Sequence, residues 1–327
     1  MRKLTYIDAI AEAQIEEMDR DENVFVIGED VDISGGVFKA TSGILEKFGG
    51  RRIFGTPISE AAFTGLAVGA AMTGLRPVVE FMYFDFVMVA MDQLVNQMAK
   101  MPLMSGGQFK MPVTVRAQAG IGSSEAAQHS QSLEAWFAHV PGIKVVMPAT
   151  VYDAKGLLKS AIRDDSPIIY IENRMMYYKA DEVPEGEWTV PLGVANIVRE
   201  GLDITIVATG YAVHAALAAV HELEKNGINA ELIDPRTIQP LDIETICASV
   251  RKTGRLLVVH EAPARCGMGA EIVRRVIENS FDYLDAPPRV LGGVSIPAPF
   301  SPALEKACFP QKEDIIETAY ALARDKI

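Results

Sequence analysis

The side chains best suited to proton transfer in this sequence are Glu60, Glu29 and His129. Glu60 opens a run of small apolar residues in "TPISEAAFTGLAVGAAM", Glu29 follows an apolar strand in "VFVIGEDV", and His129 lies in "GIGSSEAAQHSQ". A carboxyl group held in a low-dielectric crevice has a raised pKa and can pass protons near neutral pH. The local patterns also fit simpler interpretations: a first-turn acid behind an N-cap at Ser59, a solvated strand-end carboxylate and a structural histidine.

The helix that Glu60 opens carries Gly65 and Gly69 four residues apart. This spacing places two positions without side chains on one helix face, where another helix can approach closely. We therefore expect Glu60 to lie at the mouth of a tightly packed helix.

Apolar strands alternate with amphipathic helices along the whole chain, which predicts an α/β fold with mostly parallel sheets. Strands are expected at 24–27 and 77–86, and helices at 7–19 and 86–101. The segment from Met175 onward is acidic, punctuated by proline and glycine, and has no clear period. We expect two domains, residues 1–186 and 187–327, with ligands bound beyond the carboxyl ends of the strands.

Composition excludes several function classes. The 327 residues carry a formal net charge of -12, which argues against nucleic acid or an anionic membrane as partner. Three widely spaced cysteines indicate reduced thiols in a cytoplasmic compartment, and no targeting or membrane-spanning segment is expected. The sequence has no GxxxxGK[ST], HExxH or GxSxG motif and no dinucleotide fingerprint.

Several segments together resemble one family. "VFVIGEDV", "RIFGTPISEAAF", "GLRPVVEFMYFDF", "AAQHSQSLEAWFAHVPGIKVV" and "LIDPRTIQPLD" occur in order along almost the whole chain. They are similar to the beta subunit of the thiamine diphosphate-dependent, decarboxylating component of 2-oxo acid dehydrogenase complexes. The resemblance implies a pyrimidine-binding domain followed by a transketolase C-terminal-like domain.

The resemblance assigns roles to individual residues. Glu60 matches the acid that bonds the aminopyrimidine ring of the cofactor, and Glu29 matches a second acid nearby. Met82 and Phe86 match residues that pack against the pyrimidine, and His129 matches a histidine that orients substrate and donates a proton during acyl transfer. The implied activity is that of an oxidoreductase acting on an oxo group with a lipoyl disulfide as acceptor.

The resemblance also implies a structural potassium ion held by oxygen ligands. The matching positions at a helix end are Ala161, Ile162, Asp164 and Ser166, and Val113 contributes from the segment "MPVTV". One departure from the family stands out, because Gly55 occupies a position where relatives commonly carry aspartate.

No GDG motif of the kind that holds the diphosphate occurs in the chain. The resemblance therefore implies an alpha subunit that carries the diphosphate and its magnesium, in a heterotetramer of two alpha and two beta subunits. The lipoyl acyltransferase core is the further expected partner.

The substrate stays open at this point among pyruvate, acetoin and branched-chain 2-oxo acids, with pyruvate the leading interpretation. A split transketolase-type enzyme half and a non-catalytic scaffold subunit are the alternatives from other classes.

Overall fold

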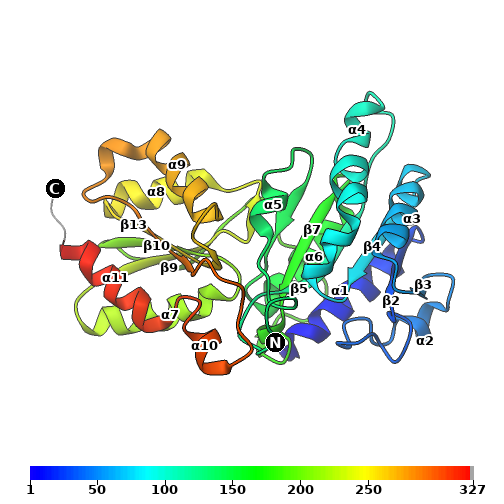
Figure 1. The fold of residues 1–327 in the computed structure, drawn as a ribbon, viewed down its shortest axis with the longest axis horizontal. Helices are drawn as coiled ribbons and strands as arrows, with labels where there is room; N and C mark the ends of the chain where they lie inside the picture. Colours follow the sequence, from blue (N-terminus) through cyan, green and yellow to red (C-terminus); the bar gives the residue numbers. More distant parts are fainter. Residues whose placement is uncertain (325–327) are drawn as a thin grey trace. The chain divides into compact units, whose positions relative to one another are not determined.

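A computed structural model describes residues 1–324, which fold as two compact units (Figure 1). The first unit comprises Met1–Ala119 and Trp136–Leu192. The second comprises Gly120–Ala135 and the chain from Gly193 onward. A segment between two parts of the first unit thus belongs with the second unit. The sequence-based boundary after residue 186 stays a prediction.

The first unit is built on a parallel sheet. Its strands follow one another in the order β6, β7, β5, β4, β2, β3, and every one of these neighbouring pairs is parallel. The predicted α/β class is confirmed. Residues of β2, β5 and β7 are buried throughout, as expected for strands covered on both faces. The elements of this unit are β1 (Arg2–Thr5), α1 (Tyr6–Arg20), β2 (Val24–Glu29), α2 (Ile44–Phe48), β3 (Ile53–Thr56), α3 (Glu60–Met72), β4 (Arg76–Phe81), η1 (Phe84–Ala90), η2 (Asp92–Met98), α4 (Met101–Met104), β5 (Thr114–Ala119), β6 (Lys144–Val146), α6 (Val151–Arg163), β7 (Ile168–Asn173), η3 (Arg174–Met176) and β8 (Ala180–Val183), with α5 (Glu134–Ala138) at the division between the units.

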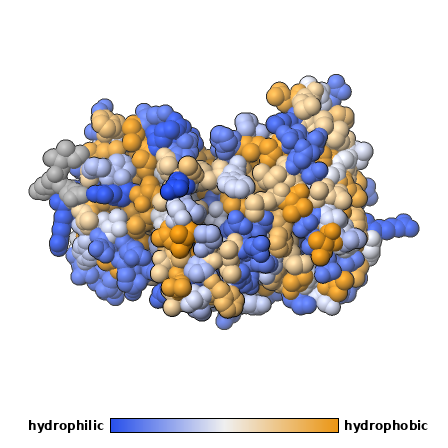
Figure 2. Space-filling view, viewed as in Figure 1, coloured by the Kyte–Doolittle hydropathy of each residue, from blue (hydrophilic) through white to orange (hydrophobic). Residues whose placement is uncertain are grey.

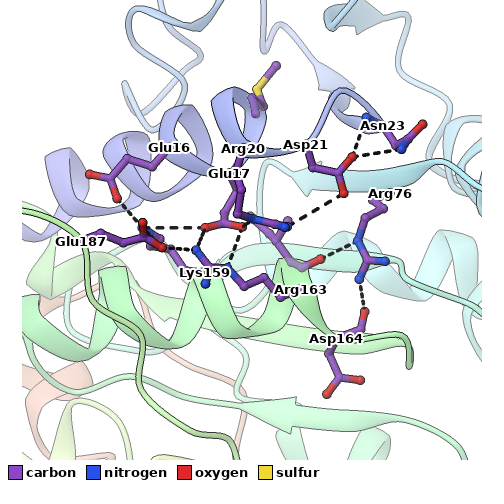
Figure 3. A network of polar contacts seen from close by, with 12 residues as sticks. Glu16, Glu17, Arg20, Asp21, Asn23, Arg76, Lys159, Arg163, Asp164 and Glu187 are labelled. Atoms are coloured by element: carbon purple, nitrogen blue, oxygen red, sulfur yellow. Dashed lines mark hydrogen bonds and ion pairs between the residues drawn. The ribbon is translucent and has the colours of Figure 1, made fainter.

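Helices α1 and α6 pack side by side and share a network of ion pairs (Figure 3). Glu17 is fully buried and accepts hydrogen bonds from Arg163 at 2.7 and 2.9 Å and from Arg20 at 2.6 Å. Lys159, also buried, pairs with Glu16, and Glu187 pairs with Arg163. Each buried charge in this network therefore has a partner of opposite sign, which limits the cost of desolvation.

The second unit has its own sheet in the order β14, β13, β10, β11, β9, in which only the β9–β11 pair is antiparallel. Helices α8 and α9 cover one face of this sheet, and α7 and α11 cover the other (Figure 1). The elements are β9 (Asn196–Arg199), β10 (Ile204–Ala208), α7 (Ala212–Lys225), β11 (Ala230–Asp234), β12 (Thr237–Gln239), α8 (Ile243–Thr253), β13 (Leu256–Pro263), α9 (Met268–Ser280), η4 (Phe281–Tyr283), β14 (Arg289–Gly293), α10 (Pro302–Lys306) and α11 (Lys312–Arg324).

Two sequence-based elements are wrong in detail. The strand expected over 77–86 ends at Phe81, and the helix expected over 86–101 is split into the 3-10 turn η1, the π-helical η2 and the short α4. Phe84, Val87 and Ala90 are buried at intervals of three, which a 3-10 turn places on one face. The pairing of β1 with β8 was not foreseen either, because both strands are short and mixed in polarity. None of the described helices is long and apolar enough to span a membrane.

Candidate functional site

Glu29 and Glu60 both lie at the carboxyl edge of the first unit's sheet. Glu29 is the last residue of β2, and Glu60 begins α3 after the short turn that follows β3. Glu29 pairs in register with Thr56 at the end of β3, so both carboxylates start from the same edge. Both are buried, with 7% and 8% of their surface exposed.

The electrostatics of this pair favour a protonated carboxyl group. Burial raises the pKa of Glu29 above its ordinary value, and the neighbouring charge of Glu60 raises it further. A hydrogen bond from the backbone of Ser59 opposes this increase in pKa. Oε1 of Glu29 is buried and has no hydrogen-bond partner among the described residues. An unpaired buried oxygen is costly, so this atom is suited to a ligand that can donate or share a proton.

The N-terminus of α3 differs from the sequence-based interpretation. Ser59 is the N-cap residue as expected, but its hydroxyl donates to the carbonyl of Pro57 at 3.0 Å and caps no helix N–H. The backbone of Ser59 is instead directed to Glu29. The turn at Ser59 thus starts α3 at Glu60 and also donates a backbone hydrogen bond to Glu29.

Met82 and Phe86 follow β4, which is the hydrogen-bonded neighbour of β2. Both are half-buried. The carbonyl of Met82 accepts a hydrogen bond from Gln118 at 3.2 Å, and the ring of Phe86 meets Tyr83 edge-on at 5.7 Å. The structure therefore brings Glu29, Glu60, Met82 and Phe86 to one edge of one sheet, although their contacts with a cofactor stay predictions.

Gly55 has a physical explanation in the loop that follows β2. A Cβ atom at position 55 would come within 2.3 Å of Oδ1 and 3.1 Å of Cγ of Asp32. The side chain of Asp32 thus fills the space that a side chain at position 55 would need. A side chain at position 55 would require the flexible carboxylate of Asp32 to move, and a second carboxylate there would also meet a like charge. The adjacent loop thus places the carboxylate of Asp32 beside position 55.

His129 belongs to the segment Gly120–Ala135, which clusters with the second unit. It is half-buried, and its backbone N–H donates to the carbonyl of Ala126 at 3.4 Å. The two predicted catalytic residues, Glu60 and His129, are therefore carried by different units. Their joint action stays a prediction.

The residues expected at a potassium ion gather around the end of α6. The guanidinium of Arg76 donates to the carbonyls of Ile162 at 2.9 Å and Asp164 at 2.7 Å, so these two oxygens face a common point. The carbonyl of Ala161 accepts from the backbone N–H of Asp164 at 3.2 Å. Each carbonyl retains a second lone pair for a hard cation, although Arg76 already supplies one positive charge here.

The other two residues of the expected potassium set make local contacts. The carbonyl of Val113 accepts from the N–H of Ile168 at 2.9 Å, and Ser166 donates its backbone N–H to the side chain of Asp164 at 2.8 Å. Among residues 1–324, no cluster of three or more His, Cys, Asp or Glu side chains could hold a metal ion. A cation at the end of α6 would therefore depend on backbone carbonyls.

Sequence reasoning missed a buried ionic network beneath the same edge. Arg116 in β5 bonds Glu172 in β7 at 2.7 and 2.8 Å and also pairs with Glu80 in β4, and all three side chains are buried. Tyr177 donates its hydroxyl to Glu172 at 2.6 Å. Burial raises the pKa of Glu80, an effect that the charge of Arg116 opposes. One charged residue within each of three apolar strands was the signal that could have revealed it.

The fold and its domains match two family models. Residues 2–179 match the transketolase pyrimidine-binding domain, and residues 193–315 match the transketolase C-terminal domain. A solved structure titled "Split gene transketolase, inactive beta4 tetramer" superposes with a TM-score of 0.82 over 99% of both chains at 22% identity, which shows the shared fold. The class is therefore that of transketolase-like proteins with a pyrimidine-binding domain.

Curated relatives narrow the family. The beta subunit of the pyruvate dehydrogenase E1 component from Rhizobium meliloti is 47% identical over 98% of this chain and 70% of its own length. The subunit of the same name from Rickettsia felis is 48% identical over 96% of this chain and 97% of its own. The chain belongs to the family of pyruvate dehydrogenase E1 beta subunits.

Proposed function

We propose that this chain is the beta subunit of a thiamine diphosphate-dependent component that decarboxylates pyruvate and transfers the acyl group to a lipoyl group on an acyltransferase core. The names of its relatives support pyruvate over acetoin and branched-chain 2-oxo acids. The observation that carries the proposal is the buried pair Glu29 and Glu60 at one sheet edge of a domain that matches the transketolase pyrimidine-binding family.

The residues present fit an aminopyrimidine. Glu60, at the first position of α3, would bond a ring nitrogen, and the unpartnered Oε1 of Glu29 lies buried beside it. Met82 and Phe86 offer apolar surface at the neighbouring strand end. Thiamine diphosphate bound here would supply the nucleophilic carbon for the chemistry at the 2-oxo group. The contribution of this chain is to orient the ring and to hold or share a proton at Glu60.

The proposed partner is an alpha subunit that completes the site with the diphosphate and magnesium, as two alpha and two beta chains. A Cβ at Gly69 would meet no atom within 4 Å, and one at Gly65 would meet only Gln93 at 3.6 Å, so this face of α3 is open. The tip that carries α4 shows hydrophobic residues among hydrophilic ones (Figure 2), and Leu103 and Met104 of α4 are exposed. Large apolar side chains are exposed on or beside α3, η1 and α4: Ile58, Leu66, Met88, Val89, Leu103 and Met104. Such a surface suits a protein partner.

The decisive experiment co-expresses the chain with its alpha subunit. Oxidative decarboxylation of pyruvate and 2-oxoisovalerate, and oxidative cleavage of acetoin, are measured with an artificial electron acceptor and thiamine diphosphate. We expect the complex to prefer pyruvate. We also expect Glu60→Gln to lower kcat at least about 100-fold, because an amide cannot share a proton with the pyrimidine ring as a carboxyl group can. The matched control is Glu46→Gln, at an exposed glutamate of α2.

Each alternative outcome has a distinct meaning. Full activity of the chain without an alpha subunit would overturn the half-site proposal. Full activity of Glu60→Gln in the complex would favour a scaffold subunit, and activity on sugar phosphates without lipoyl transfer would favour a split transketolase. Loss of assembly in Gly69→Leu, measured by light scattering, would support the open face of α3 as the site of the partner.

We propose potassium as an additional ligand at the end of α6, bound by the carbonyls of Ala161, Ile162, Asp164 and Val113 and by Ser166. Two of these carbonyls already accept hydrogen bonds from Arg76, so the ion would share them with the guanidinium through their second lone pairs. We expect the melting temperature to rise with potassium chloride but not with choline chloride at equal ionic strength. Equal melting temperatures in both salts would exclude the ion.

We also propose a cytoplasmic location, because Cys247, Cys266 and Cys308 are all unpaired thiols. The domain division after residue 186 is retained as a proposal alongside it.

A further inference from the structure

A buried carboxylate in the second unit holds the loop that leads to His129. Glu305 lies in α10 and is only 2% exposed. Its Oε1 accepts the backbone N–H of Gly122 at 2.9 Å, and its Oε2 accepts the backbone N–H of Ser124 at 2.9 Å and the hydroxyl of Ser124 at 3.2 Å. Both carboxylate oxygens of Glu305 thus accept hydrogen bonds from one loop. This loop is distant from Glu305 in the sequence but belongs to the same unit.

The backbone of this loop depends on such a partner. Gly122 has a φ of 118° and Ser124 a φ of 59°, in the region that ordinary side chains seldom occupy. Ala126, whose carbonyl accepts the N–H of His129, also has a positive φ, at 62°. Conformations of this kind persist only when surrounding contacts impose them. The three hydrogen bonds that the Glu305 carboxylate accepts from Gly122 and Ser124 are contacts of that kind.

The anchor is itself held by the sheet of the second unit. The backbone N–H of Glu305 donates to Ser301 at 2.8 Å, and the carbonyl of Cys308 accepts the N–H of Val294 at 2.8 Å, directly after β14. The backbone N–H of Cys308 in turn donates to the carbonyl of Glu305 at 2.9 Å, so hydrogen bonds link Val294 to Cys308, Cys308 to Glu305 and Glu305 to Ser124. Five residues further along the chain lies His129.

We infer that Glu305 is a positioning residue for His129: it fixes the conformation of loop 122–126 and thereby the place from which His129 acts in acyl transfer. This inference rests on the proposed function of His129. Glu305 has no part in the chemistry itself in this scheme, because both of its oxygens are bonded to the loop. Glu305→Gln keeps the size of the side chain but turns one acceptor into a donor that faces a backbone N–H.

The test uses the assembled complex with its alpha subunit and a lipoyl domain as acceptor. In Glu305→Gln we expect amide hydrogen exchange of Gly122 and Ser124 to be roughly 10-fold faster. We expect kcat for lipoyl acylation to fall by about 10- to 100-fold with little change in KM, because the reacting group is misplaced. Glu317→Gln, at an exposed glutamate of α11, is the matched control and should behave as the parent.

A double-mutant cycle with His129→Ala separates positioning from a general effect on folding. If Glu305 acts through His129, adding Glu305→Gln to His129→Ala should lower kcat by less than about twofold. Equal losses in both backgrounds would overturn the positioning role. If Glu305→Gln fails to fold, Glu305→Asp, which retains the charge on a shorter side chain, is taken through the same cycle.

The two ways in which the inference can fail are distinguishable. Unchanged exchange at Gly122 and Ser124 would show that Glu305 does not anchor the loop. Faster exchange combined with full activity of His129→Ala would instead refute the role of His129, and with it the positioning role of Glu305, while the anchor itself stands.

Discussion

The burial of Glu134 predicts that the free energy of unfolding depends measurably on pH. It lies at the start of α5, is 2% exposed, and its Oε2 has no hydrogen-bond partner among the described residues. Burial raises the pKa of this carboxyl from 4.5 to about 7, partly opposed by a hydrogen bond from its own backbone. No described cation forms an ion pair with it within 4 Å, so the neutral form is the one that the fold favours.

The sign and size of the effect follow from linkage. Between pH 4.5 and pH 7 the folded protein holds this proton and the unfolded chain does not, so the free energy of unfolding falls as pH rises. A shift from 4.5 to about 7 corresponds to about 3 kcal/mol, which is fully lost above pH 7. Glu134→Gln, with a neutral side chain of the same size, should escape this loss. Its advantage should be under about 1 kcal/mol at pH 5 and about 3 kcal/mol at pH 8.

Urea denaturation of the two proteins at pH 5, 6, 7 and 8 measures this difference, and comparison with the parent cancels the titration of all other groups. Glu46→Gln serves as the control, because an exposed glutamate should give a difference near zero at every pH. A constant difference between pH 5 and 8, or a Gln variant that is less stable at pH 8, would refute the reasoning that Glu134 is buried without a charge partner.

Three further variants test the packing and the buried charges. Gly55→Asp should lower the melting temperature because its Cβ meets Asp32, and Asp32→Ala should restore it in the double variant; two additive losses would contradict this explanation. Arg116→Met leaves Glu80 and Glu172 buried without a counter-charge and should lower the free energy of unfolding by ~3–5 kcal/mol in denaturant. A decrease below about 1 kcal/mol would mean that water reaches these two carboxylates. Lys159→Met should lower the free energy of unfolding, measured by the same denaturation in 0 and 1 M salt. A larger decrease in 0 M salt means that solvent ions screen the ion pairs of Lys159, and equal decreases mean that they do not.

The parts of the fold that follow a strong period were predictable from the sequence. Helix α1 and strand β2 lie within a few residues of their expected positions, because their apolar residues follow one spacing and face one core. The edge of the sheet was predictable for the same reason: Glu29 ends an apolar strand, and strands of an α/β fold share an orientation. The resemblance to a family was needed to give Glu60 a role, because its local pattern fits an ordinary helix start equally well.

Contacts between residues distant in the sequence could not be predicted. The occupation of the space beside Gly55 by Asp32 depends on how the loop after β2 folds back onto β3. The pairing of Arg116 with Glu80 and Glu172 depends on the order of β4, β5 and β7 in the sheet, which periodicity does not reveal. The replacement of one regular helix by η1 and η2 likewise reflects what those residues bury.

The predicted site residues are divided between the two units: His129 belongs to the second unit, and Glu29 and Glu60 belong to the first. The histidine that we propose to act in acyl transfer lies in a loop between two strands of the first unit, and the carboxylate of Glu305 accepts hydrogen bonds from Gly122 and Ser124 of that loop. The two acids that we propose to face the pyrimidine, Glu29 and Glu60, in contrast lie at a strand end and a helix start of the first unit. We expect substitutions in α10 to slow acyl transfer and to leave pyrimidine binding intact. Substitutions at Glu29 should weaken pyrimidine binding and, because acyl transfer requires the bound cofactor, slow the later step as well. Cofactor binding measured separately from acyl transfer therefore distinguishes the proposed contributions of the two units.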